Sequence, residues 1–180
     1  DEEYNFFLSV IFPHNQMKIL PYNRVVKDLK GMCKAEFFLN VSHNFTYEET
    51  EQKEPGKRGE FCLYVDGKWY KLTAKGGSFD KNDAVHSLDV SILQDNLLNP
   101  VLDIKDPRKD KRIDFVGGIR GSQELERLVD SKNFKIAFAF YPTDIEQLFK
   151  VANSGKVMPP KSTWFEPKLE SGLVTHLLED

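Results

Sequence analysis

Two β-type segments joined by Asp66-Gly67 constrain the fold of this chain more than any other feature. The segments are residues 61–65 and 68–72, and both are rich in aromatic and branched apolar side chains. An Asp-Gly pair between two such segments is the strongest short-range signal for a β-hairpin. A type I′ turn needs positive φ at both positions, which Gly adopts freely and Asp tolerates. The sequence therefore predicts a hairpin at this point.

Four other segments have the composition of strands. Residues 5–13 and 134–141 are continuous apolar runs of the kind that is buried on both faces. We expect the first of these runs to form a central strand at the start of the chain. Residues 113–116 and the tail, residues 173–178, predict two further strands.

Helical periodicity is expected between the strands. Residues 25–29 and 33–41 predict two short helical pieces, and an apolar stripe over residues 90–98 predicts a helix that stops at Pro100. Residues 47–60 are rich in Glu, Lys and Gly and show no apolar period, so we expect a solvated loop without chemistry there.

Two later helices carry start signals. Ser122 is placed to cap a helix after residues 113–116, which gives a β-turn-α unit. Thr143 and Glu146 match a capping box for a helix that Gly155 ends. Strands and helices mix without a strict βαβ rhythm or a repeat. We therefore expect one α+β or mixed α/β domain over residues 1–180, with helices packed on a mixed sheet.

Composition narrows the class of protein. The chain has 180 residues, of which 40% are hydrophobic, and its 25 basic residues nearly balance 28 acidic ones. The positive field of most nucleic-acid binders is missing, although residues 105–112 carry five basic and two acidic side chains. We interpret that segment as a solvated connector, with nucleic-acid binding as the weaker alternative. No apolar run approaches the roughly 20 residues of a membrane span, so we expect a soluble, cytoplasmic protein.

Cysteine and histidine chemistry is sparse. Cys33 and Cys62 have no motif around them and are expected to be reduced thiols. The four histidines are far apart and have no ligand partner at helical spacing, so no metal site is predicted.

The first of three unusually polar segments follows the opening run. Ends of buried strands are where α/β proteins place ligand groups, and this segment supplies hydrogen-bond donors, an acceptor and one titratable ring. A hydrogen-bonded loop with a neutral histidine cap is the alternative. The candidate residues are His14, Asn15, Tyr22, Asn23 and Arg24.

The second segment is a glycine turn. Gly117 and Gly118 would let the backbone approach a ligand closely, and Arg120 would add a full charge to an anion site at the following helix start. The spacing matches neither the dinucleotide nor the P-loop fingerprint. A plain strand-to-helix turn needs similar glycines and remains the alternative.

The third segment is a proline-rich stretch near the end of the chain. Lys161 would place a point charge on a phosphate, with Ser162 and Thr163 as hydroxyl donors. Glu166 would act as a general base or pair with Lys168. A stiff connector anchored by aromatic residues explains the stretch nearly as well.

Longer sequence stretches in and between these segments resemble the sequences of a known family. The family is the prokaryotic domain of unknown function 1015, and the chain resembles its C-terminal half over essentially all 180 residues. The phrases that carry the resemblance are FPHNQMKILPYNRVVKDL, YVDGKWYKL, SLDVSILQDNLLNPVLDI, FVGGIRG and MPPKSTWFEPKLESGL. Family members are about twice as long, and their N-terminal half carries an Asp-Gly-His-His-Arg element similar to one in ParB-like and free-serine-kinase proteins. That element is absent here, so we expect this chain to be a C-terminal fragment of a longer protein.

The resemblance implies a function for the whole protein. It implies a nucleotide-dependent enzyme that phosphorylates a small metabolite, with serine as one candidate and Mg²⁺ with the nucleotide. The fragment alone would be inactive, and its partner would be the missing N-terminal domain. A non-catalytic metabolite-binding or interaction domain is the alternative. The residues on the family's recurrent polar motifs are His14, Asn15, Tyr22, Asn23, Arg24, Gly117, Gly118, Arg120, Lys161, Ser162, Thr163, Glu166 and Lys168.

One spatial prediction joins these motifs. Arg24, Arg120 and Lys161 are expected to converge in a shared, positively charged pocket that binds phosphate. His14 and Glu166 are the candidates for catalytic acid–base work.

Overall fold

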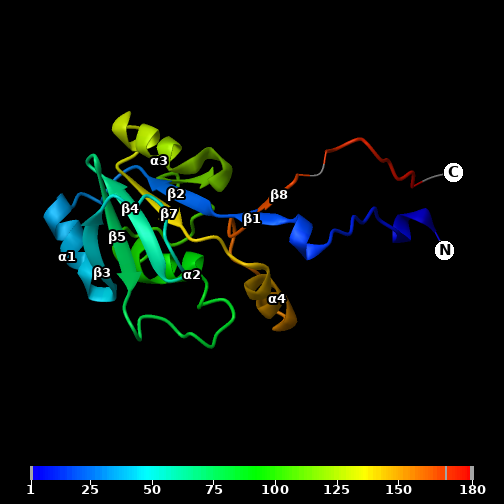
Figure 1. Ribbon diagram of the computed structural model, residues 1–180, viewed down its shortest axis with the longest axis horizontal. Coiled ribbons are helices and arrows are strands. Elements are labelled where there is room, and N and C mark those ends of the chain that lie inside the picture. Colours follow the sequence, from blue (N-terminus) through cyan, green and yellow to red (C-terminus); the bar gives the residue numbers. More distant parts are fainter. Residues whose placement is uncertain (1, 169, 179–180) are drawn as a thin grey trace. The chain divides into compact units, whose positions relative to one another are not determined.

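The computed structural model describes residues 2–168 and 170–178 (Figure 1). It divides into two compact units: Ile19–Trp164 forms one, and Asp1–Lys18 with Phe165–Asp180 forms the other. The larger unit contains a six-stranded sheet and the longer helices, so the predicted α+β class is confirmed.

The main sheet is antiparallel between every pair of neighbours described and has the order β3-β5-β4-β7-β2-β6. A two-stranded sheet is formed by β1 (Lys18–Leu20) and β8 (Trp164–Glu166). The strands of the main sheet are β2 (Tyr22–Val26), β3 (Phe45–Thr50), β4 (Glu60–Val65), β5 (Lys68–Ala74), β6 (Ile113–Gly117) and β7 (Ile136–Phe140).

The predicted hairpin is confirmed as β4 and β5. Val65 pairs with Lys68, and the two residues between them, Asp66 and Gly67, have φ values of 49° and 77°. Positive φ at both positions is the requirement of the type I′ turn from which the hairpin was predicted.

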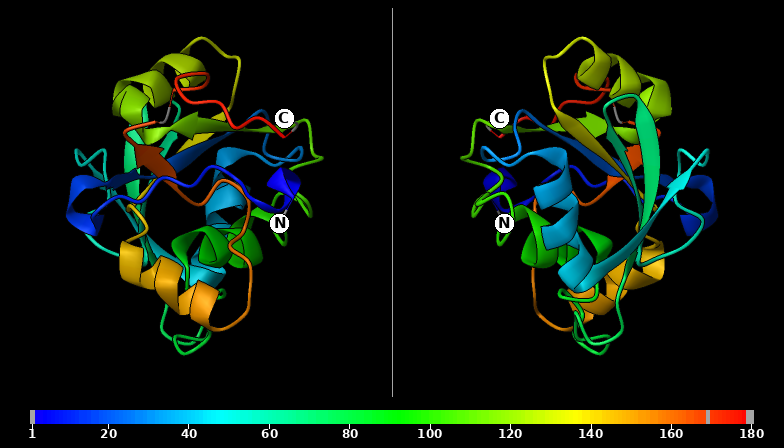
Figure 2. Two further views of the ribbon diagram at one scale, coloured as in Figure 1. Left: turned by 90° about the vertical axis from the view of Figure 1, so that its right-hand side faces the viewer. Right: turned by 90° about the vertical axis from the view of Figure 1, so that its left-hand side faces the viewer.

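Helices cover both faces of the main sheet (Figure 2). One face carries α1, α2 and the π-helical turn that continues α2, and the other face carries α3. Side chains alternate between the two cores along each central strand, as the twofold repeat of a strand requires. The helices are α1 (Lys34–Asn44), α2 (Asp89–Leu93), α3 (Gly121–Asp130) and α4 (Ile145–Asn153); the short helical turns are η1 (Glu3–Asn5), η2 (His14–Gln16), η3 (Gln94–Leu98) and η4 (Gly118–Arg120).

Two local predictions in the first half of the main unit are wrong. Residues 25–29 do not begin a helix, because Val25 and Val26 end β2 and are buried in opposite cores. Two adjacent β-branched residues suit that alternation better than a helical face. The predicted loop 47–60 is a strand up to Thr50, and its polar side chains reflect the exposed edge position of β3.

The predicted strands at the two ends of the chain are also absent. Residues 6–13 have no regular secondary structure, and Phe7 and Ile11 are 85% and 91% exposed. The tail is similar, because residues 173–178 form no strand and Leu173 is 75% exposed. A strand needs a neighbour for its backbone hydrogen bonds, and neither run has a paired strand among the described residues.

The two helix starts lie close to their predicted positions. Gly121 begins α3, so Ser122 lies inside the helix and is not its cap. Asp144 caps α4 in place of Thr143, and its Oδ1 accepts the Gln147 N–H at 2.8 Å. The capping box thus starts one residue later than predicted, at Asp144 with Gln147, while the Thr143 hydroxyl donates to the Ser162 carbonyl. Gly155, with a φ of 68°, follows the end of α4 as predicted.

Candidate functional site

Strand pairing brings the first two polar segments together. In the register of β2 and β6, Tyr22 lies opposite Gly117. The Gly118 N–H then donates to the Pro21 carbonyl at 2.8 Å. Residues nearly 100 positions apart in the sequence therefore meet at this edge of the main sheet.

The third polar segment reaches the same place. The Arg24 Nη2 donates to the Lys161 carbonyl at 3.4 Å, and the Lys161 ammonium lies 5.1 Å from the centre of the Tyr22 ring. The rings of Tyr22 and Trp164 are 5.2 Å apart. We call these residues, Tyr22, Arg24, Gly117, Lys161 and Trp164, the Arg24 corner. All three predicted segments contribute to it.

Arg24 is the most unusual side chain of the corner. It is only 3% exposed, and its guanidinium lies between the rings of Phe115 and Phe140, at 5.3 and 4.6 Å from their centres. Its Nη1 donates to the Tyr22 carbonyl at 2.9 Å, while its buried Nε has no hydrogen-bond partner. No carboxylate of the described residues lies within ion-pair distance of it.

The electrostatics of Arg24 follow from this burial. Removal from water lowers the pKa of the Arg24 guanidinium to about 9, so it is still charged at neutral pH. Buried charges are normally paired, because an isolated charge in a low-dielectric interior is costly. The corner therefore contains positive charge that the described side chains do not balance.

Packing accounts for the two glycines of the second segment. A Cβ on Gly117 would lie 2.4 Å from the Trp164 ring, and one on Gly118 would lie 2.7 Å from Pro21. These glycines thus allow close approach of other parts of the chain. Arg120, whose side chain is 66% exposed, lies 3.6 Å from Glu124. The structure brings Arg24 and Lys161 together, while Arg120 pairs with α3.

Three further predicted residues are held in internal contacts or partly covered. The Asn23 Oδ1 accepts the Phe140 N–H at 3.1 Å, and Asn23 is buried. The Ser162 hydroxyl donates to the Pro159 carbonyl at 2.6 Å. Thr163 is half-buried. Asn23 and Ser162 therefore help to fix the backbone around the Arg24 corner.

The remaining predicted residues belong to the smaller unit. The side chain of His14 lies outside the described part of the structure. Asn15 and Lys168 are exposed, and Glu166 is half-buried in β8. The catalytic roles of His14 and Glu166 stay predictions.

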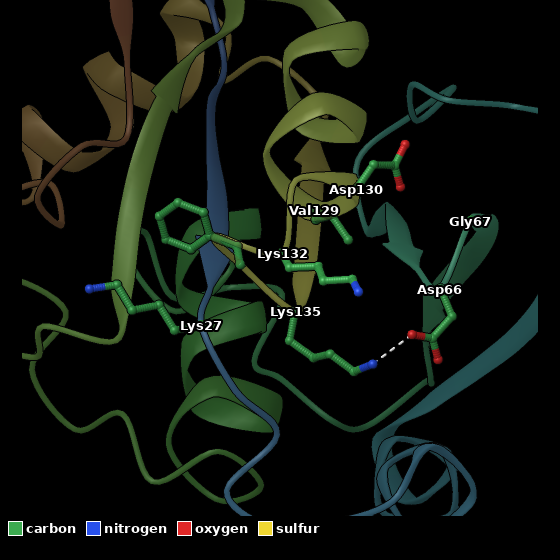
Figure 3. Close-up of a pocket in the computed structure, with 8 residues that line it drawn as sticks. Lys27, Asp66, Gly67, Val129, Asp130, Lys132 and Lys135 are labelled. Carbon is green, nitrogen blue, oxygen red and sulfur yellow. Dashed lines mark hydrogen bonds and ion pairs between the residues drawn. The ribbon is translucent and has the colours of Figure 1, made fainter.

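A cavity of about 440 Å³ lies at the turn of the hairpin (Figure 3), and no predicted site residue is among the described residues that line it. Lys135 reaches Asp66 across it, with 2.6 Å between Nζ and Oδ1, whereas Lys27 extends away from this pair. Asp130 on its wall accepts the Tyr64 hydroxyl at 2.9 Å. The charged side chains of this cavity are exposed, and Lys135 and Asp66 neutralise each other as an ion pair. We therefore assign the cavity no function.

Sequence reasoning overlooked one buried carboxyl group. Asp89, at the start of α2, is 8% exposed and lines a separate cavity of about 310 Å³. A single Asp at a helix start is common in sequences, so nothing in the pattern around it indicated burial.

Metal, thiol and membrane features are few in the described part of the chain. It holds no group of three or more His, Cys, Asp or Glu side chains that could bind a metal ion. Both cysteines are free, and burial raises the pKa of Cys62 to about 12. None of the described helices has the length and apolar character that a bilayer crossing requires.

Solved structures place this fold in a known class. A free serine kinase mutant in complex with AMP matches with a TM-score of 0.50 and 14% identity, over 84% of this chain and 54% of that one. A conserved hypothetical protein from Pyrococcus furiosus matches with a TM-score of 0.50 and 16% identity, over 83% of this chain and 56% of the other. The chain thus shares their fold and spans about half of their length.

Sequence comparison then identifies the family. The model of the family described as "Protein of unknown function (DUF1015)" matches residues 1–91 of the 180. The chain belongs to this family. No curated protein matches the chain with significance.

Proposed function

We propose that this chain is one part of a nucleotide-dependent, phosphoryl-handling enzyme that acts on a small metabolite, with serine as one candidate. The observation that carries the proposal is the buried Arg24 guanidinium, which has no acidic partner among the described residues. A phosphate group bound at the Arg24 corner would supply the missing negative charge.

The two cations of the corner have different roles in this proposal. Lys161 is exposed and would contact a phosphate oxygen directly. Arg24 is buried, so it would act through its field, which is weakly screened in the protein interior. Arg24 also holds the Lys161 carbonyl, and in this way it positions the lysine. Phosphoryl transfer depends chiefly on such positioning and positive charge.

The structural relatives support the same proposal. One of them is a free serine kinase in complex with AMP, and this chain spans 54% of its length. We infer that a further part of the protein completes the site and covers the exposed apolar side chains of residues 6–11. Mg²⁺ has no ligand set among the described residues, and the roles given to Arg24 and Lys161 do not depend on it.

Nucleotide binding tests the proposal on the longer protein that contains this chain. We expect ATP, ADP or CTP with Mg²⁺ to raise its melting temperature. Lys161→Ala is expected to weaken binding about tenfold, as loss of one charged contact does. The matched control is Lys109→Ala, because Lys109 is 84% exposed and outside the corner. Absence of stabilisation by all three nucleotides would refute the proposal.

A second experiment separates the enzyme from the non-catalytic alternative. The longer protein is incubated with nucleotide and a metabolite library, and the mixture is followed by mass spectrometry. Consumption of one metabolite with gain of a phosphoryl group supports the enzyme. A metabolite that is retained by the protein but unchanged supports a binding domain.

A further inference from the structure

The cavity at Asp89 is built from segments that none of the sequence-predicted residues occupy. It lies beside α2, and its wall includes Arg58 just before β4, Lys81 from the loop after β5, and Lys150 from α4. Its volume of about 310 Å³ is near the lower end of the range of ligand pockets, which is roughly 300–1,000 Å³. We call this cavity the Asp89 pocket.

The buried side of the Asp89 pocket carries one carboxyl group. Asp89 is 8% exposed, and its Oδ1 accepts the Gly59 N–H at 2.9 Å. Its second oxygen, Oδ2, has no hydrogen-bond partner among the described residues. Ile92, which is 1% exposed, provides apolar surface beside it. An acceptor oxygen without a described partner, on a residue that lines the pocket, is available to accept a hydrogen bond from a ligand.

The exposed side of the pocket has the opposite charge. Lys81 and Lys150 are both exposed, and neither forms an ion pair with a described acid. Arg58 is ion-paired with Asp144. The lining of the pocket therefore includes two exposed lysines without a described acidic partner and one carboxylate oxygen without a described hydrogen-bond partner.

We propose that the Asp89 pocket binds a compact hydroxylated organic anion of the size of a triose phosphate. Its phosphate group would lie between Lys81 and Lys150, and a hydroxyl at its other end would donate to Asp89 Oδ2. Burial raises the pKa of Asp89 to about 7, which leaves a substantial carboxylate fraction at neutral pH. The proposal shares no residue with the Arg24 corner. Its test is therefore independent of the test of the proposed function.

The structural role of Asp89 must be separated from ligand binding. Its bond to Gly59 links α2 to the start of β4, so loss of the side chain would loosen the fold. Asp89→Asn keeps an oxygen for the Gly59 N–H and removes the charge. This variant tests the acceptor without cutting the link.

The experiment uses the 180-residue chain and ¹⁵N-resolved NMR titration with glycerol 3-phosphate, with inorganic phosphate and glycerol as separate arms. We expect shifts at the amides of Gly59, Ser87 and Gln147, which line the pocket. Glycerol 3-phosphate should bind about tenfold more tightly than phosphate alone, because only the ester can reach Asp89. Asp89→Asn should remove most of that advantage.

Charge variants complete the test. Lys81→Gln and Lys150→Gln should each weaken glycerol 3-phosphate binding about tenfold. Lys109→Gln, an equal change of charge outside the pocket, should stay within about twofold. The proposal is overturned if glycerol 3-phosphate causes no amide shifts up to about 10 mM, or if the shifts map to the cavity in Figure 3. It is also overturned if Lys109→Gln weakens binding as much as the two pocket variants do. Should Asp89→Asn unfold, Ser87→Ala serves as the second variant, because Ser87 lines the pocket and loss of one hydroxyl hydrogen bond to the ligand should weaken binding about threefold.

Discussion

The Arg24 corner and the Asp89 pocket each bury a charge that no side chain of opposite sign neutralises by direct contact. Arg24 is 3% exposed and is held by two backbone carbonyls and two aromatic rings. Asp89 is 8% exposed and is held by one backbone N–H. Burial shifts the pKa of each group toward its neutral form, downward for the arginine and upward for the aspartate.

The two groups differ in whether they can become neutral near physiological pH. A pKa of about 9 keeps Arg24 protonated at neutral pH, so only a bound anion can balance it. With a pKa of about 7, Asp89 can take up a proton instead. The charge of the Asp89 pocket therefore changes with solvent pH, whereas the positive charge of the Arg24 corner is balanced only when an anionic ligand binds.

The largest expected effect comes from Asp89→Asn at high pH. Because the folded pKa is about 7 and the unfolded value 3.8, the carboxyl group favours folding most below pH 4 and loses that contribution as pH rises through 7. At pH 8 the variant should be more stable than the wild type by about 4 kcal/mol, and at pH 4 the two should be nearly equal. Urea unfolding at both pH values measures this. A difference that does not change with pH would contradict the assignment.

The next effect concerns packing at the corner. Gly117 has a φ of −60°, so alanine there meets no backbone strain, but its Cβ would overlap the Trp164 ring. We expect Gly117→Ala to lower the free energy of unfolding by about 2–3 kcal/mol. Gly76→Ala is the matched control, because nothing lies within 4 Å of that position. Equal effects in the two variants would mean that the ring is free to move away.

Replacement of the buried cation should have a smaller effect of opposite sign. Arg24→Met fills similar space without a charge, so we expect a gain of about 1 kcal/mol in the free energy of unfolding, with loss of nucleotide binding in the longer protein. Arg112→Met is the comparison, because Arg112 lies 2.8 Å from Asp110 and should lose stability when replaced. If Arg24→Met destabilised the chain as Arg112→Met does, Arg24 would be a structural residue.

The smallest expected effect comes from Thr143, which helps to hold the segment that carries Lys161. The Thr143 hydroxyl donates to the Ser162 carbonyl at 3.3 Å, next to the carbonyl that Arg24 holds. Thr143→Val should cost about 0.5–1 kcal/mol on denaturant unfolding. It should also weaken nucleotide binding more than its cost in stability predicts, if that segment must be fixed in place. Unchanged binding would assign all of the positioning to Arg24.

Sequence reasoning succeeded where the signal was local and where polar segments flanked strands. It predicted β6 and β7 and the approach of Lys161 to Arg24. It failed at residues 25–29, where neighbours on both sheet faces decided between strand and helix. It failed again at residues 5–13, because an apolar run forms a strand only beside another strand.

The sequence by itself determined the hairpin, because positive φ at Asp66 and Gly67 is a property of those two residues. It also determined the polar segments and their charges. Only the tertiary structure decided that Arg24 and Asp89 are buried and Arg120 is not. Burial is set by what packs around a side chain, and those neighbours come from segments that are distant along the chain.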